Sequence, residues 1–198
     1  MVTFAQVSRS LLAVAFATSL AAAQQPTAAA PAPLPDNGPK VGDLAPDFTL
    51  PSAGKDGEGK PVTLSSLRGR TVVIAFFPRS RTSGCTAQMK AYRDQYATLF
   101  NGGDGVTVLA ISTDSASVQA AWAREEGFPQ TFVSDVNAVT GPRYDVVVER
   151  NGAKFFRRML YVIGPDGRIQ HVMRPFRELS ADAYTELGEA VKKARGAN

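Results

Sequence analysis

The one cysteine of the chain, Cys85, closes the run Pro78-x-x-x-Thr82-x-x-Cys85. The run follows the apolar stretch 71–77 and precedes a stretch with helical spacing. Unpaired N–H groups at a helix start favour the thiolate over the thiol, and the thiolate is the reactive form. The spacing therefore predicts a nucleophilic thiol. The alternative is a small buried hydrophobe, the commoner fate of a free cysteine, but the polar loop before Cys85 predicts greater exposure than that.

The first residues have the pattern of an export signal. Arg9 is followed by the apolar run 11–20 and by small residues up to Ala23, which predicts a signal peptide over residues 1–23. The apolar run is short for a membrane span, so an uncleaved anchor is the weaker alternative. We expect an exported protein, periplasmic or secreted, with no stable membrane association after cleavage.

The mature chain is predicted to consist of a linker and one domain. Residues 24–40 are rich in alanine and proline, which is typical of a flexible linker, and residues 41–198 have the length of one domain. The net charge of +4 is spread along the chain, so no nucleic-acid partner is expected. One cysteine and one histidine support neither a metal site nor an internal disulfide, and no cofactor is expected.

Hydrophobic spacing predicts the element order β-β-β-α-β-α-β-β-β-α. Helices between buried strands indicate a parallel core, and Gly164-Pro165-Asp166-Gly167 indicates a late hairpin. The predicted class is α/β, a thioredoxin-like three-layer α/β/α sandwich with a mixed sheet and an N-terminal β-hairpin. The expected strands are 48–50, 62–64, 71–77, 105–111, 131–133, 158–163 and 168–173, and the expected helices are 86–100, 115–127 and 181–193.

Several segments together resemble the peroxiredoxins, the thiol peroxidases of the thioredoxin superfamily. The run from Pro78 to Cys85 is similar to the family's active-site signature, and 41–50 to its N-terminal signature. Thr82-Ser83-Gly84-Cys85-Thr86 and Arg93-Asp94 resemble the branch called bacterioferritin comigratory protein, or PrxQ. The segment 158–167 is similar to the strand and turn that carry the family's second catalytic cation. The resemblance covers essentially all residues after Lys40.

This resemblance implies a peroxidase that reduces hydrogen peroxide or organic hydroperoxides through a Cys85 sulfenic acid. Attack on an O–O bond needs a thiolate and fixed donors for the leaving oxygen, and the amides of Gly84 and Cys85 are expected to bind the peroxide. The Thr82 hydroxyl can accept from the hydroperoxide while donating to the thiolate. Arg158 is implied to hold the thiolate and the developing charge, and Pro78 to shield the thiolate from water.

Each of these residues also has a simpler interpretation. The simpler interpretation of Thr82 is a helix cap, and that of Pro78 is the end of a strand. For the role of the second catalytic cation, the alternation of side chains along the strand leaves Arg157 and Arg158 nearly equal. The position of this cation in the family's sequence pattern favours Arg158. The segment 112–114 follows a strand, where pockets are common, but we expect it to cap the next helix. Packing roles are expected for Trp122 and for His171.

The sequence departs from the family at Lys90, where many PrxQ relatives carry a resolving cysteine, and Ser83 stands where proline is frequent. Without a second cysteine, the mechanism must be of the one-cysteine kind. The expected partners are a peroxide substrate and an external thiol reductant, which is thioredoxin, glutaredoxin or a small thiol. The protein is expected to be a monomer or a homodimer. Without an external thiol, two molecules could also join through their Cys85 residues.

Two other functions stay open at this point. An exported thioredoxin-like disulfide oxidoreductase needs Cys-x-x-Cys, because the second thiol releases the mixed disulfide, and Thr82 occupies the place of the first cysteine. A non-catalytic thiol redox sensor would use oxidation of Cys85 as a switch. Turnover with a reductant would separate such a sensor from an enzyme.

Overall fold

The computed structural model describes residues 37–196. The predicted signal peptide 1–23 and most of the predicted linker 24–40 lie outside these residues and stay predictions. Gly38 is buried against the domain, where a side chain would meet the Tyr144 carbonyl oxygen, so the packed chain begins before residue 41. In the described part of the chain, no helix has the length and apolar character needed to cross a bilayer.

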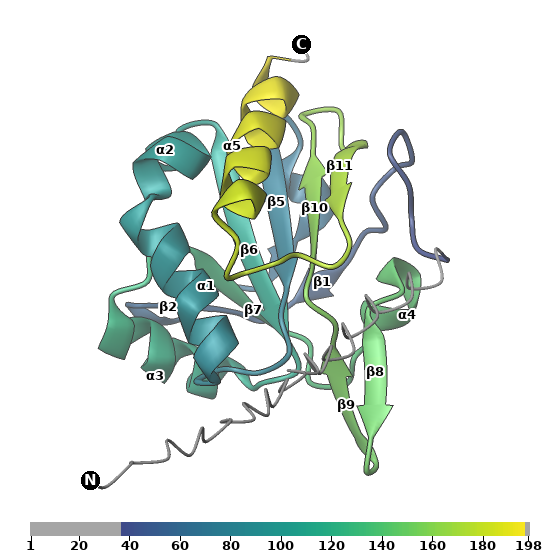
Figure 1. Ribbon diagram of the computed structural model, residues 1–198. Helices are drawn as coiled ribbons and strands as arrows, with labels where there is room; N and C mark the ends of the chain where they lie inside the picture. Colours follow the sequence, from purple (N-terminus) through teal and green to yellow (C-terminus); the bar gives the residue numbers. More distant parts are fainter. Residues whose placement is uncertain (1–36, 197–198) are drawn as a thin grey trace, which may run out of the picture. The chain divides into compact units, whose positions relative to one another are not determined.

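A seven-stranded mixed sheet forms the centre of the domain (Figure 1). Its strand order is β11-β10-β5-β6-β7-β2-β3, and β5, β6 and β7 are parallel, while the other neighbours are antiparallel. The strands are β2 (Ser52–Gly54), β3 (Gly57–Glu58), β5 (Thr71–Phe76), β6 (Val106–Ser112), β7 (Thr131–Ser134), β10 (Met159–Ile163) and β11 (Ile169–Met173). The predicted parallel core and late antiparallel hairpin are both confirmed.

The side chains of β5 alternate between two hydrophobic cores, which places the sheet between two layers. Val73 and Ala75 face α1 (Ser83–Asp94), α2 (Tyr96–Phe100), α3 (Ala116–Glu126) and α5 (Ala181–Arg195). Ile74 and Phe76 face the other side, together with Phe48 and with α4 (Gly141–Tyr144). The predicted three-layer α/β/α class is therefore confirmed, with one helical layer and one layer made largely of short segments.

The N-terminal hairpin is confirmed, because β1 (Thr49–Leu50) pairs antiparallel with β4 (Val62–Thr63). No strand was predicted in the segment between these two strands, yet it supplies β2 and β3 at the edge of the main sheet. A second hairpin, β8 (Val147–Arg150) and β9 (Ala153–Phe156), was not predicted. Its turn is Asn151-Gly152 with positive φ at both residues, which is a strong local hairpin signal.

The helices differ from the prediction mainly at the start of the active-site helix. A single helix over 86–100 was expected, but α1 begins three residues earlier, at Ser83, and ends at Asp94. The backbone of Gln95 leaves the helical region before α2 begins. The helix 115–127 is confirmed as α3. The Ser115 hydroxyl accepts from the Val118 amide at its start, and Gly127 takes the left-handed conformation at its end. The short turn η1 (Leu64–Leu67) follows β4.

Candidate functional site

Cys85 lies in the first turn of α1, directly after the loop that leaves the central strand β5. The first helical bond of that turn joins the Thr86 amide to the Thr82 carbonyl at 2.8 Å. The Cys85 side chain is 0% exposed and packs in the core with Met89, one helical turn later, and with Leu160. The expectation that Cys85 is more exposed than a buried residue is therefore wrong, because its position in the turn directs it toward the sheet.

Arg158 is the cation that the fold brings to the thiol. The residue directly precedes β10, which pairs with β5, and its Nη2 lies 3.5 Å from Cys85 Sγ. Its side chain is 12% exposed, so the contact is largely shielded from water. The arrangement places a planar, permanently charged donor where negative charge on sulfur or on a leaving oxygen would develop. Arg157 instead donates its backbone amide to the Val146 carbonyl.

Two polar residues that the sequence did not single out complete the surroundings of Arg158 on the α1 side. Arg158 Nη1 donates to the side-chain oxygen Oε1 of Gln88, and Gln88 Nε2 donates to the Tyr92 hydroxyl at 2.8 Å. Gln88 and Tyr92 are both 0% exposed, and burial raises the pKa of Tyr92 far above its ordinary value. A polar residue one turn after Cys85 on the same helix face was the available signal for Gln88.

The third contact of Arg158 is the Glu178 carboxylate, from the segment between β11 and α5. Arg158 Nε and Glu178 Oε2 are 3.1 Å apart. A Cβ on Gly84 would lie 2.5 Å from Glu178 Oε1 and 3.1 Å from Arg158 Nη2. The missing side chain at Gly84 therefore leaves room for this ion pair. Burial, with the nearby Glu178 charge, raises the pKa of Tyr184 to about 12.

The loop before α1 is held from three directions. Asp114 Oδ2 accepts from the Ser80 amide at 2.7 Å, which connects the loop to the end of β6. The Arg81 guanidinium pairs with Glu125 of α3 through two contacts, one of them Nη2 to Oε1 at 2.9 Å. Arg79 lies over the Phe155 ring of β9. The prediction that 112–114 caps the next helix is thus wrong for Asp114, which holds the active-site loop while Ser115 is the cap.

The two remaining predicted site residues lie at the ends of this loop. Pro78 is half-buried just after β5, and Thr82 is the last residue before α1. The Thr82 hydroxyl donates to the Arg79 carbonyl at 3.0 Å. Its proton is therefore directed into the loop rather than toward the thiol, and its oxygen lone pairs are available as acceptors. The catalytic roles expected for Thr82 and Pro78 stay predictions.

Comparison with known proteins agrees with this geometry. Residues 41–172 match the family model described as the AhpC/TSA family. Peroxiredoxin Bcp of Escherichia coli is 34% identical over 142 residues, which cover 70% of this chain and 87% of that protein. The chain belongs to the AhpC/TSA family and is a peroxiredoxin. The chloroplast peroxiredoxin Q of Sedum lineare is 36% identical over 131 residues, 66% of this chain and 67% of that protein.

Solved structures show the same relationship for the fold. The crystal structure of peroxidoxin BcpB from Mycobacterium tuberculosis covers 81% of this chain and 99% of its own, with a TM-score of 0.66 and 28% identity. The Xylella fastidiosa PrxQ structure gives a TM-score of 0.68 at 23% identity and 79% coverage of this chain, 98% of its own. The resemblance to the Bcp and PrxQ branch is therefore confirmed, and the peroxiredoxin is a thiol-dependent peroxidase with a single cysteine.

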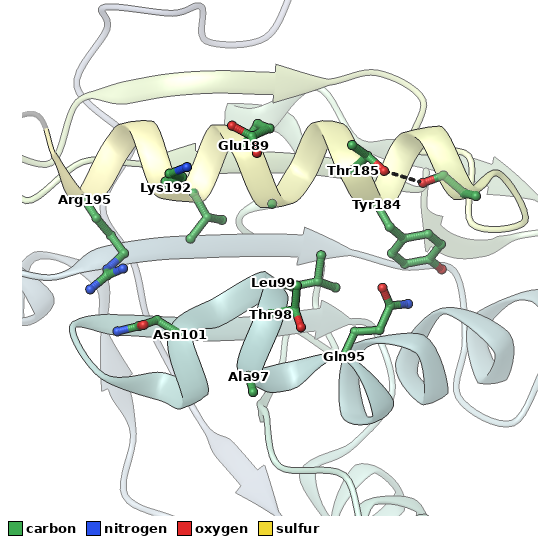
Figure 2. Close-up of a pocket in the computed structure, with 13 residues that line it drawn as sticks. Gln95, Ala97, Thr98, Leu99, Asn101, Tyr184, Thr185, Glu189, Lys192 and Arg195 are labelled. Carbon is green, nitrogen blue, oxygen red and sulfur yellow. Dashed lines mark hydrogen bonds between the residues drawn. The ribbon is translucent and has the colours of Figure 1, made fainter.

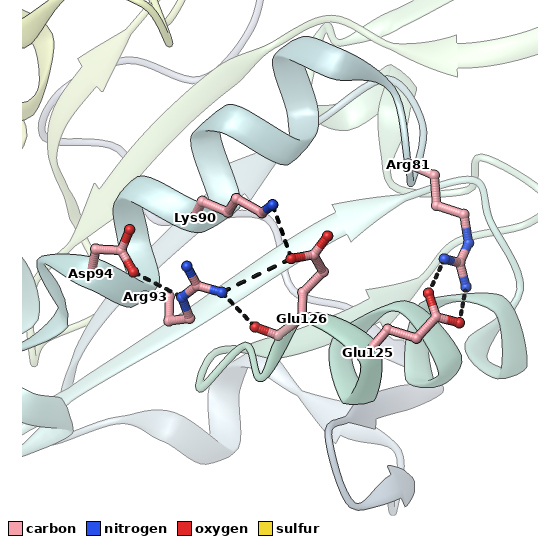
Figure 3. Close-up of polar contacts among 6 residues, drawn as sticks. All are labelled: Arg81, Lys90, Arg93, Asp94, Glu125 and Glu126. Atoms are coloured by element: carbon pink, nitrogen blue, oxygen red, sulfur yellow. Dashed lines mark hydrogen bonds and ion pairs between the residues drawn. The ribbon is translucent and has the colours of Figure 1, made fainter.

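In this peroxiredoxin Lys90, which stands where many PrxQ relatives carry a resolving cysteine, connects two helices (Figure 3). Lys90 Nζ of α1 lies 3.1 Å from Glu126 Oε2 of α3. Arg93 Nη1 donates to the Glu126 carbonyl oxygen at 2.7 Å and lies 3.9 Å from its carboxylate. Together with Arg81 and Glu125, these contacts fix α1 and its preceding loop to α3 along one side.

A groove of about 530 Å³ separates α2 from α5 in this peroxiredoxin (Figure 2). Gln95, Leu99, Tyr184, Gly188 and Lys192 are among its lining residues. Tyr184 connects the groove to the site, because its hydroxyl donates to the Glu178 carbonyl oxygen at 2.7 Å.

The remaining candidate residues have structural contacts. Within residues 37–196, no group of three or more His, Cys, Asp or Glu side chains has the geometry to hold a metal ion. His171 Nε2 lies 2.8 Å from Glu186 Oε1 on the surface of α5. Trp122 is buried in a cluster of aromatic rings with Phe77, Phe128 and Phe132, so its expected packing role is confirmed.

Proposed function

We propose that this peroxiredoxin reduces hydrogen peroxide or organic hydroperoxides in a one-cysteine cycle. The Cys85 thiolate attacks one oxygen of the peroxide, so that an S–O bond forms and the O–O bond breaks. The other oxygen leaves as hydroxide or alkoxide and takes a proton, and Cys85 becomes a sulfenic acid. One external thiol then displaces water to form a mixed disulfide with Cys85, and a second thiol releases the Cys85 thiol.

The observation that carries this proposal is the contact between Arg158 Nη2 and Cys85 Sγ at 3.5 Å. Arg158 is fixed by Gln88 and Glu178, so its donors are in place before charge develops on the leaving oxygen. The amides at the start of α1 add partial positive charge on the same side of the sulfur. Thr82, whose oxygen is available as an acceptor, is proposed to orient the hydroperoxide.

The reductant must come from another molecule, because the chain has one cysteine. Since Cys85 is 0% exposed, a protein thiol reaches it only after the loop or the first turn of α1 moves. A small thiol needs a smaller movement than thioredoxin or glutaredoxin does. We propose a thiol of one of these classes as the partner, with either a monomer or a homodimer as the working form.

The first experiment mixes the reduced protein with one equivalent of peroxide and measures the intact mass. We expect a gain of one oxygen, and a dimedone adduct that maps to Cys85. Peroxide consumption is then followed with glutathione, thioredoxin and glutaredoxin in parallel. Multiple turnovers with any of them establish an enzyme. A single oxidation without turnover would support the redox-sensor alternative instead, and a protein that gains no oxygen would rule out both.

We also propose that the protein is exported to the periplasm or secreted, on the basis of the signal-like residues 1–23. Cleavage after Ala23 would leave a mature chain that begins at Gln24. N-terminal sequencing of the protein from cell fractions checks this directly. A protein that retains Met1 and stays with the membrane fraction would indicate an uncleaved anchor.

A further inference from the structure

We propose that Glu178 is a specificity-determining residue, which neutralises Arg158 at the thiol and so keeps the site selective for uncharged hydroperoxides. The inference rests on the proposed peroxidase function. It concerns which peroxides the site accepts, and it follows from the position of one carboxylate in relation to the two groups that react.

The guanidinium of Arg158 has its three nitrogens engaged by three different groups. Nη2 faces Cys85 Sγ at 3.5 Å, Nη1 faces Gln88, and Nε faces Glu178 Oε2 at 3.1 Å. Of these partners, Gln88 is neutral and Glu178 carries a full charge in its ionised form. The Arg158 cation is therefore already paired when the thiol is in its reduced form.

The Glu178 carboxylate also lies against the start of α1. Its Oε1 would be 2.5 Å from a Cβ on Gly84, so it occupies the space that any other residue at position 84 would fill. This is the first turn of the helix, where the unpaired amides attract anions. The carboxylate thus competes with an incoming anion both for the helix start and for Arg158.

Glu178 is held in this position by the protein and is partly shielded from solvent. Its carbonyl oxygen accepts from the Tyr184 hydroxyl at 2.7 Å, and its side chain is 23% exposed. Partial burial weakens screening by water and salt, so the charge acts on a nearby substrate more strongly than a surface carboxylate does. Without Glu178, Arg158 and the helix start would form an attractive site for anions.

The test compares two substrates that differ in charge and by one methyl group. One is a short tertiary alkyl hydroperoxide with a terminal carboxylate, and the other is the methyl ester of the same molecule. The second-order rate constant for oxidation of Cys85 is measured without reductant, by quenching and intact mass, for the wild type and for Glu178→Gln. We expect the wild type to prefer the ester, and Glu178→Gln to lower the ester-to-carboxylate rate ratio by about fivefold.

Two further variants separate charge from structure. Glu186→Gln removes the same charge from the surface of α5, where Glu186 contacts His171, and should leave the ratio at the wild-type value. Glu178→Asp keeps the charge but shortens the side chain. Both of its rates are expected to fall while the ratio stays close to that of the wild type.

Three results would contradict the proposal: an unchanged ratio in Glu178→Gln, an equal change in Glu186→Gln, or a wild type that prefers the carboxylate. A wild type that reacts with neither substrate, nor with hydrogen peroxide, would contradict the proposed function instead. Circular dichroism of each variant establishes that the rates refer to folded protein. If Glu178→Gln does not fold, the wild-type preference and its loss at high ionic strength still test the charge effect.

Discussion

Replacing Cys85 with serine is expected to reduce peroxide consumption to the uncatalysed rate, a loss of at least about a thousandfold. A serine hydroxyl is far less ionised than a thiol and does not accept an oxygen from a peroxide to give a stable acid. Arg158, Gln88 and the helix start remain in place in this variant, so the loss isolates the sulfur. The measurement is peroxide consumption in the presence of the reductant identified for the wild type.

The matched control is Ser83→Ala, at an exposed residue in the same first turn of α1. This variant should retain activity, because the Ser83 side chain is directed away from the core that holds Cys85. Cys85→Ser should also show no mass gain after peroxide treatment. Turnover by Cys85→Ser at a rate near that of the wild type would show that the chemistry is not at Cys85.

The second large effect is expected for Arg158→Met, which keeps an unbranched side chain and removes its charge and its hydrogen-bond donors. The second-order rate constant for oxidation of Cys85 should fall by about a hundredfold to a thousandfold. Two causes act together: the donor 3.5 Å from the sulfur is lost, and the Glu178 carboxylate is left without its cation beside the thiolate. Single-turnover oxidation, followed by intact mass, measures the effect on the chemical step.

Arg157→Met is the control for this prediction, since it removes the same charge one position away. The alternation of side chains along the strand does not distinguish Arg157 from Arg158 as the catalytic cation. In the structure, it is Arg158 that contacts Cys85. We expect the Arg157 variant to oxidise within about threefold of the wild-type rate. Equal losses in the two variants would mean that general positive charge, rather than one positioned guanidinium, promotes the reaction.

Much of the fold follows from local sequence signals. The buried runs of β5 and β6 are apolar on both faces, and α3 begins at a serine and ends at a glycine, as expected of a capped helix. The turn 164–167 joins β10 to β11, as its glycines and proline indicate. The β8 and β9 hairpin had an equally local signal in Asn151-Gly152, so it was predictable.

Only the part of the site that lies within the run 78–85 is predictable from local sequence. Cys85 and Thr82 follow from the loop and helix start, but the contact between Cys85 and Arg158 joins residues 73 positions apart. Arg158 was predicted from its position in the family's sequence pattern. Nothing comparable pointed to Glu178 or to Asp114, because their roles depend on how the segment before α5 and the end of β6 fold back onto α1. The burial of Cys85 likewise depends on tertiary packing rather than on the polarity of its neighbours in sequence.

Because Cys85 is buried, a peroxide reaches its sulfur more easily during oxidation than a protein thiol does during reduction. A peroxide is a few atoms across, whereas a protein thiol needs a whole surface to approach the 0% exposed sulfur. We expect that approach to require separation of α3 from the loop, where Arg81 pairs with Glu125, and from α1, where Lys90 pairs with Glu126. Oxidation therefore needs only small fluctuations of the closed protein, while regeneration by a protein depends on a rarer opening. With a protein reductant, turnover should saturate at the frequency of that opening, so the separation of the loop and α1 from α3 would set the upper limit on the enzyme's rate.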